Sequence, residues 1–297
     1  MELETHKSGF VNIIGKPNVG KSTLINAMLG EKLCIITNKA QTTRHRIFGI
    51  HNTENVQIVF SDTPGIIDHP AYKLQEKMME FVNTAYIDAD LFLYVVEANM
   101  TPSIELIPKQ IVHTEVPVFI VINKIDLSNP DSLEELVNRW LTILPKAKMF
   151  PIAALHNFNT TELLAKVIEQ MPVHPPYYDK EALTDKPERF FVSEIVREKI
   201  LLNYEKEIPY STEVFVLSFK EKEGKVYIEC EIHVMRESQK GILIGSKGIM
   251  LKKLLDQSKK DIEHFLQQEV FLFLKIKVKD DWRNNDLYLK QKGYSLD

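Results

Sequence analysis

The sequence predicts an α/β domain with a mostly parallel sheet, followed by a smaller α+β domain. Apolar runs of strand length alternate with segments of helical period over residues 10–170. Strands that alternate with helices along a chain favour a parallel sheet that is covered by helices on both faces. After a proline-rich stretch the order changes to a helix, two paired strands, further helices and a last strand.

The first domain is expected to contain five strands that are buried on both faces. These strands cover residues 10–14, 56–60, 91–96, 118–122 and 149–152. The helices expected between them cover residues 22–29, 72–86, 101–112, 132–144 and 161–170.

Prolines mark the expected domain boundary. Pro172, Pro175, Pro176 and Pro187 favour extended backbone and stop helices. We therefore expect a first domain at residues 1–171, a Pro-rich linker at 172–188 and a second domain at 189–297. Because proline-rich linkers are stiff, this one is expected to act as a semi-rigid spacer.

The second domain is expected to be a compact α+β module. Its expected helices cover residues 189–204 and 249–266, with a glycine-interrupted helical segment at 240–248. Its expected strands cover residues 213–219, 225–234 and 270–278. Phe271 and Phe273, on the last strand, are expected in the core.

Composition narrows the class of protein. The chain has 297 residues, of which 44% are hydrophobic. It contains no uninterrupted run of about 18 apolar residues, so no membrane span is predicted. Residues 1–8 are polar and lack a leader pattern. Cys34 and Cys230 are the two cysteines, in no metal-ligand spacing, so we expect buried, reduced thiols and a cytoplasmic protein.

Charge is uneven along the chain. The net charge is −4, yet residues 236–260 hold seven basic residues against two acidic ones. A basic stretch in an acidic protein indicates a polyanionic partner that binds at one place. Peripheral association with the inner membrane through Lys-rich faces is a further alternative, although no amphipathic anchor is visible in the sequence.

Residues 15–22, GKPNVGKS, match the phosphate-loop pattern G-x-x-x-x-G-K-[ST]. They follow an apolar strand and begin a helix, which is the context that this loop requires. The glycines let successive backbone N–H groups point at phosphates, Lys21 reaches the terminal phosphates, and the Ser22 hydroxyl binds Mg²⁺. The residues expected to contact the nucleotide here are Gly15, Asn18, Val19, Gly20, Lys21, Ser22 and Thr23.

Residues 123–126, NKID, select the base. An Asp126 carboxylate accepts hydrogen bonds from the N1–H and N2–H₂ groups of guanine, whereas adenine presents an unfavourable acceptor at N1. Asn123 is expected to join the base and phosphate loops, and the Lys124 stem is expected to cover the ring. The sequence therefore predicts GTP and GDP as ligands.

Two further stretches predict the Mg²⁺ site. In residues 62–65, DTPG, Asp62 is expected to hold Mg²⁺ through water and the Gly65 N–H to meet the γ-phosphate. Thr42 and Thr43 lie in a polar loop that can supply a second hydroxyl, and we favour Thr43. The alternative is that both threonines belong to a solvated loop. The expected metal residues are Ser22, Thr43 and Asp62.

The order of these motifs resembles the translation-factor-type GTPases, and the second domain narrows the resemblance to the Era family. Residues 244–248, IGSKG, resemble the GxxG loop of a KH domain, and residues 207–211 and 277–282 are similar to Era-family counterparts. The resemblance implies a P-loop GTPase fold followed by a KH-type domain. In the fifth GTPase motif, Ala153 and Ala154 stand where Ser-Ala is usual, and their backbone N–H groups are expected to contact the guanine O6.

The resemblance also implies the RNA ligand. A GxxG loop clamps about four nucleotides of single-stranded RNA, because glycines let the backbone approach phosphates closely. The implied target is the 3′ end of small-subunit ribosomal RNA, during assembly of the small ribosomal subunit. The residues expected to contact RNA are Lys240, Ile244, Gly245, Ser246, Lys247, Gly248, Lys252 and Lys253.

The catalytic residues are the least defined. Many GTPases orient the attacking water with a glutamine near the DTPG motif, but Ile66 and Ile67 follow Gly65. Asn18 resembles the asparagine with which related GTPases bind K⁺, so slow, K⁺-stimulated hydrolysis is expected, with Asn18, Thr43 and Gly65 as candidate catalytic residues. The alternative function is an RNA-binding assembly factor whose GTP site is structural and does not cycle. The oligomeric state stays open.

Overall fold

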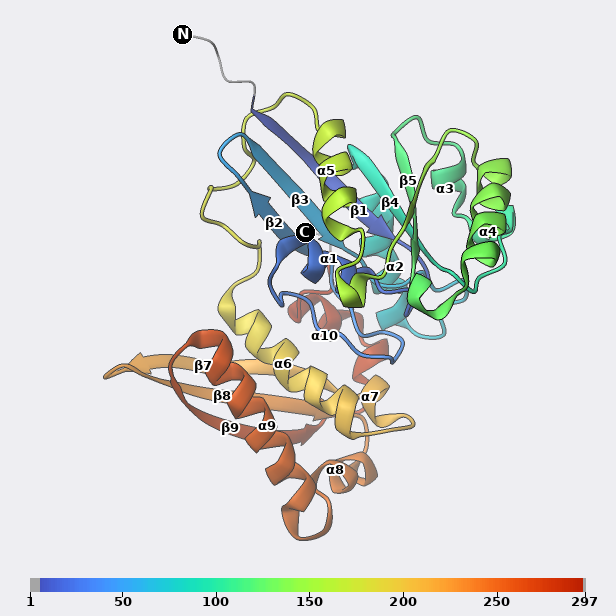
Figure 1. Cartoon of the computed structure of the whole chain (residues 1–297). Coiled ribbons are helices and arrows are strands. Elements are labelled where there is room, and N and C mark those ends of the chain that lie inside the picture. Colours follow the sequence, from blue (N-terminus) through green and yellow to red (C-terminus); the bar gives the residue numbers. More distant parts are fainter. Residues whose placement is uncertain (1–5, 296–297) are drawn as a thin grey trace.

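A six-stranded sheet forms the centre of the first domain in this computed structural model, which describes residues 6–295 (Figure 1). The strand order is β2-β3-β1-β4-β5-β6, and only β2 runs antiparallel to its neighbour. The strands are β1 (Lys7–Ile14), β2 (Ile47–Asn52), β3 (Val56–Asp62), β4 (Leu91–Glu97), β5 (Val118–Asn123) and β6 (Lys148–Pro151). The expected mostly parallel sheet is confirmed.

The expectation of no leader rests partly on residues 1–5, which lie outside the described residues.

Helices cover both faces of this sheet. Helices α1 (Lys21–Leu29) and α5 (Thr160–Gln170) pack on one face, against the apolar side chains of β1 and β3. The opposite face is covered by α2 (Lys73–Ala85), α3 (Lys109–Val112) and α4 (Pro130–Ile143). This arrangement places the loop between β1 and α1 at the carboxyl edge of the parallel strands, where α/β proteins bind ligands.

Two expectations about the first domain are wrong. Strand β2 was not expected, because Gly49 interrupts its apolar pattern. A Cβ at Gly49 would lie 2.5 Å from Leu29 Cδ1, so glycine lets helix α1 approach the strand closely. The helix expected at 101–112 is instead a 3₁₀ turn, Ile104–Leu106, followed by α3. Pro108 separates the two, because its ring occupies the position of a helical N–H.

The proline-rich segment lies along the edge of the first sheet. The Ile50 N–H donates to Leu183 O at 2.9 Å, and the Gln57 side chain accepts from the N–H groups of Tyr177 and Tyr178. Helix α6 (Glu188–Asn203) begins directly after Pro187. The segment is therefore attached to the first domain, and it does not extend between the domains as a spacer.

A three-stranded sheet with helices on one face forms the second domain (Figure 1). Its strands are β7 (Glu213–Lys222), β8 (Lys225–Val234) and β9 (Glu269–Val278), and helices α6, α8 (Glu237–Ile244) and α9 (Ile249–Leu266) supply the core. Phe273 is 60% exposed, because odd-numbered residues of β9 point to the uncovered face. Phe271 lies on the same face, where it stacks on Tyr227 with the ring centroids 4.9 Å apart. The expectation that Phe271 and Phe273 belong to the core is wrong, since neither is part of the apolar cluster of this domain.

Short helices complete the chain. The sequence did not predict α7 (Ile208–Ser211) or α10 (Asp286–Gln291). The remaining 3₁₀ turns are Ile125–Leu127, Ala154–His156, Ser246–Gly248 and Trp282–Asn284. No helix within residues 6–295 is long and apolar enough to cross a membrane.

The C-terminal segment of the second domain packs against the first domain. Trp282, Leu289 and Tyr294 form one apolar cluster with Met78 and Phe81 of α2. Figure 1 shows α10 beside the first domain, above the second sheet. The two domains therefore share buried surface.

A buried ion pair also joins the domains. Arg44 of the first domain donates to Glu213 on β7 at 2.6 Å, and their side chains are 0% and 5% exposed. The same guanidinium donates to the carbonyls of Pro209 and Thr212, at 3.0 and 2.8 Å. Arg44 directly follows Thr43, so a predicted metal residue lies next to the domain interface.

Candidate functional site

The phosphate loop is built around glycines that no other residue can replace. A Cβ at Gly20, whose φ is 98°, would lie 2.2 Å from Asn123 Nδ2. A Cβ at Gly15 would lie 2.5 Å from Val95 O. Both positions need glycine, because a side chain would collide with the neighbouring strand or with the base-binding loop.

Lys21 lies inside this loop. Its Nζ donates to the Gly15 and Lys16 carbonyls at 3.0 and 2.9 Å. Burial lowers the pKa of Lys21 to about 8, although Asp62 acts in the opposite direction. A bound polyphosphate would restore the ordinary pKa, because anionic oxygens favour the charged amine.

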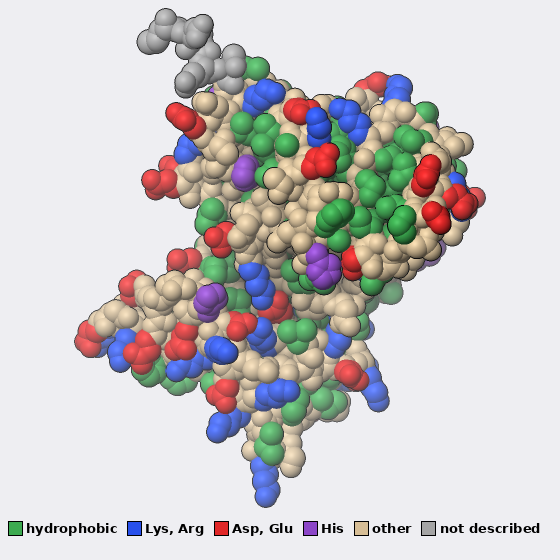
Figure 2. Space-filling view, viewed as in Figure 1, with side chains coloured by type: hydrophobic (Ala, Val, Ile, Leu, Met, Phe, Trp, Pro, Cys, Tyr) green, Lys and Arg blue, Asp and Glu red, His purple; other side chains and the backbone are tan. Residues whose placement is uncertain are grey.

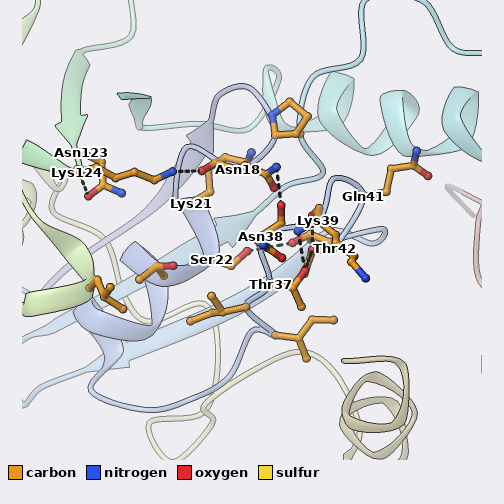
Figure 3. A pocket seen from close by; sticks show the side chains of 18 of the residues that line it. Asn18, Lys21, Ser22, Thr37, Asn38, Lys39, Gln41, Thr42, Asn123 and Lys124 are labelled. Carbon is orange, nitrogen blue, oxygen red and sulfur yellow. Dashed lines mark hydrogen bonds between the residues drawn. The ribbon is translucent and has the colours of Figure 1, made fainter. Parts of the chain in front are cut away.

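A pocket of about 560 Å³ lies over the phosphate loop (Figure 3). The predicted residues in its lining are Asn18, Gly20, Lys21, Ser22, Thr23, Thr43, Gly65, Asn123, Lys124 and Asp126. Five predicted residues are not part of the lining: Gly15, Val19, Asp62, Ala153 and Ala154. Most of the motifs therefore meet at one cavity.

Asn123 joins the two loops, as the sequence predicts. Its Nδ2 donates to Val19 O at 2.9 Å, and its Oδ1 accepts from the N–H groups of Lys124 and Ala154. Lys124 has a left-handed backbone with φ of 63°, and its Nζ donates to Asn18 O at 2.7 Å. This geometry holds the Lys124 stem across the pocket, where it can cover one face of a base (Figure 3).

Asp126 belongs to the lining of the pocket. Its carboxylate is 3.7 Å from His156 Nε2, and it is partly exposed. Leu127, the next residue, and Leu155 also line the pocket, and both are largely exposed. A carboxylate flanked by apolar side chains suits a flat base that carries two adjacent N–H donors.

The fifth motif is arranged differently from the expectation. The Ala153 N–H donates to Phe158 O, and the Ala154 N–H donates to Asn123 Oδ1. Both N–H groups are thus used inside the first domain, and Leu155 is the residue of this turn that lines the pocket. The alanine in place of serine removes no contact that the structure shows.

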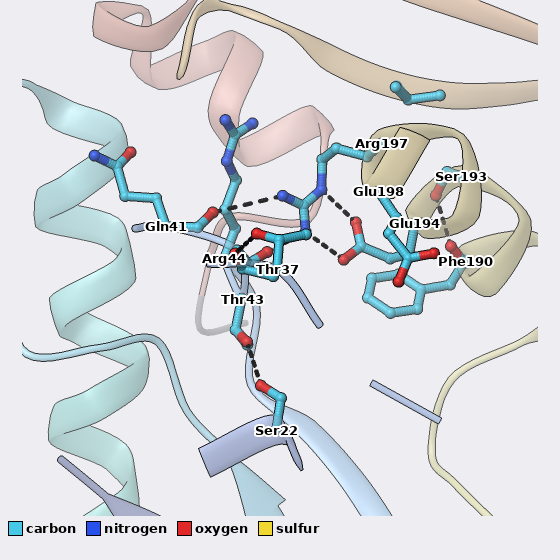
Figure 4. A network of polar contacts seen from close by, with 12 residues as sticks. Ser22, Thr37, Gln41, Thr43, Arg44, Phe190, Ser193, Glu194, Arg197 and Glu198 are labelled. Atoms are coloured by element: carbon cyan, nitrogen blue, oxygen red, sulfur yellow. Dashed lines mark hydrogen bonds and ion pairs between the residues drawn. The ribbon is translucent and has the colours of Figure 1, made fainter. Parts of the chain in front are cut away.

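The predicted metal residues form one cluster. The hydroxyls of Ser22 and Thr43 donate to Asp62 Oδ2 at 2.8 and 3.1 Å, and the two hydroxyls are 3.0 Å apart (Figure 4). The Thr42 hydroxyl instead contacts Thr37 and the Lys39 carbonyl, both at 2.6 Å. The geometry supports Thr43 over Thr42 as the second hydroxyl.

The environment of Asp62 fits a divalent cation. Its side chain is fully buried, and its Oδ1 accepts from no N–H or O–H group among the described residues. Burial raises the pKa of Asp62, while Lys21, Ser22 and Thr43 lower it to a smaller extent. Residues 6–295 contain no cluster of three His, Cys, Asp or Glu side chains suited to a metal. The side chains grouped around Asp62 are instead the hydroxyls of Ser22 and Thr43.

The two residues after Gly65, Ile66 and Ile67, have no polar side chain that could orient water. A Cβ at Gly65 would lie 2.7 Å from the Pro17 backbone, so this glycine lies directly against the phosphate loop. The Ile66 N–H donates to Gly15 O at 3.2 Å, and the side chains of Ile66 and Ile67 pack in apolar clusters. No side-chain amide therefore occupies either of the two positions after Gly65.

The candidate RNA site is the turn between α8 and α9. Gly245 and Gly248 have positive φ, and a Cβ at Gly245 would lie 2.6 Å from Met250 Cγ. Ser246 and Lys247 are exposed at the tip, Ile244 is half-buried beside them, and Lys252 and Lys253 are exposed on α9. Lys240 lies 3.8 Å from Glu237 on α8. Figure 2 shows basic side chains among apolar ones at this end of the second domain.

Sequence reasoning missed part of the pocket. Ile35, Ile36, Thr37, Asn38 and Lys39 also line it, together with Leu127 and Leu155. Leu127 directly follows Asp126 and could have been inferred from that position. Residues 35–39 match no motif, and the backbone path of the loop brings them to the pocket.

Comparisons with known proteins cover both domains. A family described as 50S ribosome-binding GTPase matches residues 10–124, and a KH domain family matches residues 207–283. The GTPase Era of Geotalea daltonii is 45% identical over 298 residues, which are 99% of this chain and 100% of that protein. The chloroplastic GTPase ERA-like protein of Oryza sativa subsp. japonica is 43% identical over 97% of this chain and 70% of its own length.

Two solved structures match nearly the whole chain. One is Era in complex with MgGDPNP and nucleotides 1506–1542 of 16S ribosomal RNA, with a TM-score of 0.93, 36% identity and coverage of 98% and 100% of the two chains. The other is an Aquifex aeolicus Era variant bound to GDP and AlF₄⁻, with a TM-score of 0.92, 35% identity and the same coverage.

Guanine selectivity is expected to depend on Asp126. In Asp126→Asn, a donor replaces the acceptor that faces N1–H and N2–H₂, so GTP binding should weaken by about 3 kcal/mol. Xanthosine triphosphate, which has an oxygen at C2, should gain affinity. Titrations with both nucleotides measure this, and Asp131→Asn, an exposed carboxylate on α4, is the matched control. Unchanged GTP affinity in Asp126→Asn would disprove the assignment.

Proposed function

Since the chain belongs to the Era family of GTPases, we propose that it couples GTP binding and hydrolysis to binding of the 3′ end of small-subunit ribosomal RNA, in assembly of the small ribosomal subunit. The observation that carries this proposal is the presence in one chain of the motif-lined pocket and the exposed, glycine-bounded turn at 245–248. A similar protein has been solved with MgGDPNP and 16S ribosomal RNA nucleotides together. For this chain we propose a cytoplasmic location, at the ribosomal subunits that it would help to assemble.

The residues of the pocket divide the work of holding GTP. We assign the phosphates to the loop N–H groups and Lys21, and the base to Asp126 and Lys124. Ser22, Thr43 and Asp62 would hold Mg²⁺, directly or through water, and Mg²⁺ would offset the charge on the β- and γ-phosphates. Asn123 holds the phosphate loop and the base-binding loop together, since its side chain forms hydrogen bonds with the backbone of Val19, Lys124 and Ala154.

A monovalent cation is our candidate for the missing catalytic group. The Asn18 Nδ2 donates to the Asn38 carbonyl at 3.0 Å, and both residues line the pocket beside the phosphate loop (Figure 3). Carboxamide and carbonyl oxygens at this position suit K⁺. A cation here would stabilise negative charge that develops during phosphoryl transfer, as an arginine finger does.

A second function is favoured by Ile66 and Ile67, whose side chains are packed and cannot orient water. In that case the protein is an RNA-binding assembly factor whose GTP is bound but not turned over. Phosphate release over many turnovers separates the two functions, because a structural site releases at most one phosphate per protein.

Hydrolysis is expected to require K⁺. Turnover of the parent protein should be faster in K⁺ than in Na⁺ at equal ionic strength, by up to about 10²-fold, the usual effect of one electrostatic stabiliser of a transition state. Asn18→Ala should lose this difference. Asn138→Ala, an exposed asparagine on α4, should keep it. Equal rates of the parent protein in the two salts would remove K⁺ from the mechanism.

RNA binding is expected to depend on the tip of the 245–248 turn. Changing Ser246 and Lys247 together to Asp places two carboxylates against RNA phosphates, so affinity should fall about tenfold or more. The probe is an RNA with the sequence of the 16S ribosomal RNA 3′ end, and GTP affinity should not change. Lys220→Asp with Lys222→Asp, on β7, is a control with a larger charge change. A folded 246/247 variant that binds RNA like the parent protein would contradict the assignment.

A further inference from the structure

The loop that carries Thr43 has no regular structure of its own. Residues 31–46 belong to no helix or strand, and Gln41 has a left-handed backbone with φ of 58°. Contacts with neighbouring elements must therefore fix this loop. On one side the Thr43 hydroxyl donates to Asp62 at 3.1 Å.

Helix α6 of the second domain supplies contacts on the other side (Figure 4). The Arg197 guanidinium donates to the carbonyls of Gln41, at 3.5 Å, and Thr42. Glu198, the next residue on the helix, lies 3.1 Å from Lys32 Nζ and accepts from the Ile36 N–H at 3.4 Å. Two consecutive residues of α6 thus contact the loop at residues 32–36 and again at residues 41–42.

Glu194 orients Arg197. It lies one turn earlier on α6, and its Oε1 accepts from Arg197 Nε at 2.7 Å while its Oε2 contacts Nη2. Arg197 is 1% exposed and Glu194 7% exposed. This pairing leaves the guanidinium little freedom, so its position is set by α6 and not by the loop.

Thr43 therefore lies between two arginine contacts with the second domain. Arg197 holds the carbonyls of the two preceding residues, and Arg44, the following residue, is held by Glu213 and the carbonyls of Pro209 and Thr212. The backbone on either side of Thr43 cannot move without breaking buried hydrogen bonds.

We propose that Arg197 is a positioning residue for the GTPase site: from the second domain it fixes the backbone beside Thr43 and so holds that hydroxyl where Mg²⁺ and the γ-phosphate bind. The inference rests on the proposed function and adds the residue through which one domain acts on the other. Loops of this kind are ordered by the γ-phosphate and Mg²⁺ and released after hydrolysis. Arg197 therefore favours Mg·GTP over GDP.

Arg197→Met tests this, because it keeps an unbranched apolar stem in place of the arginine stem and removes both donors to the loop. Affinities for a non-hydrolysable GTP analogue and for GDP are measured on the full-length protein over a Mg²⁺ titration. Affinity for the analogue should fall at least about fivefold, and its Mg²⁺ requirement should rise. Affinity for GDP should stay within about twofold, below the range of ordinary coupling. Arg197→Lys should restore part of the loss.

The control variants separate positioning from general damage. Arg197→Met with Glu194→Gln removes the unpaired buried carboxylate and should show the same selective loss in a stable protein. Arg189→Met, exposed on the same helix, should behave like the parent protein. Equal losses for the analogue and GDP, or no loss for either, would overturn the proposal. Phosphate release by the parent protein tests the proposed function separately, since the Arg197 assays measure binding alone.

Discussion

The buried pair of Arg44 and Glu213 fixes how the two domains meet. Burial alone would raise the pKa of Glu213, but Arg44 and Arg197 together hold it below its ordinary value, so the carboxylate stays charged. The Tyr294 hydroxyl also donates to Glu213, at 2.7 Å. Removing one partner of such a pair typically costs about 3–5 kcal/mol, because the other charge stays buried and unpaired. The domain arrangement is therefore specific, and Thr43 lies directly beside it.

This placement makes one short loop responsive to both domains. Within the first domain, the Thr43 hydroxyl donates to Asp62. From the second domain, Arg197 donates to the Gln41 carbonyl, and Glu213 accepts from Arg44. A ligand that broke these contacts would change the free energy of the domain contact, and by linkage a change in the domain contact would alter the affinity for that ligand. The proline-rich segment contributes little freedom, since it is bonded to the first sheet.

The sequence predicted what depends on local patterns. The phosphate loop, Asn123, Asp126 and the turn at 245–248 each need a short run of defined residues, and the structure gathers the nucleotide set in one pocket. The contacts of Arg44 and Arg197 could not be predicted from the sequence, because their partners lie more than 150 positions away along the chain. Strand β2 was missed because Gly49 interrupts its apolar pattern. The glycine is needed there because helix α1 packs closely against the strand, which is a contact that the local sequence does not show.

We infer that the nucleotide pocket and the RNA site are energetically coupled through the loop that carries Thr43. The most direct test is the affinity of the full-length protein for the 16S ribosomal RNA 3′ end, measured once with GDP and once with a non-hydrolysable GTP analogue. We predict tighter RNA binding with the analogue, by about 5–150-fold, the ordinary range for coupled sites. By reciprocity, RNA should tighten binding of the analogue by the same factor. Identical RNA affinities in the two nucleotide states would mean that the domains are energetically independent and that the two sites are not coupled.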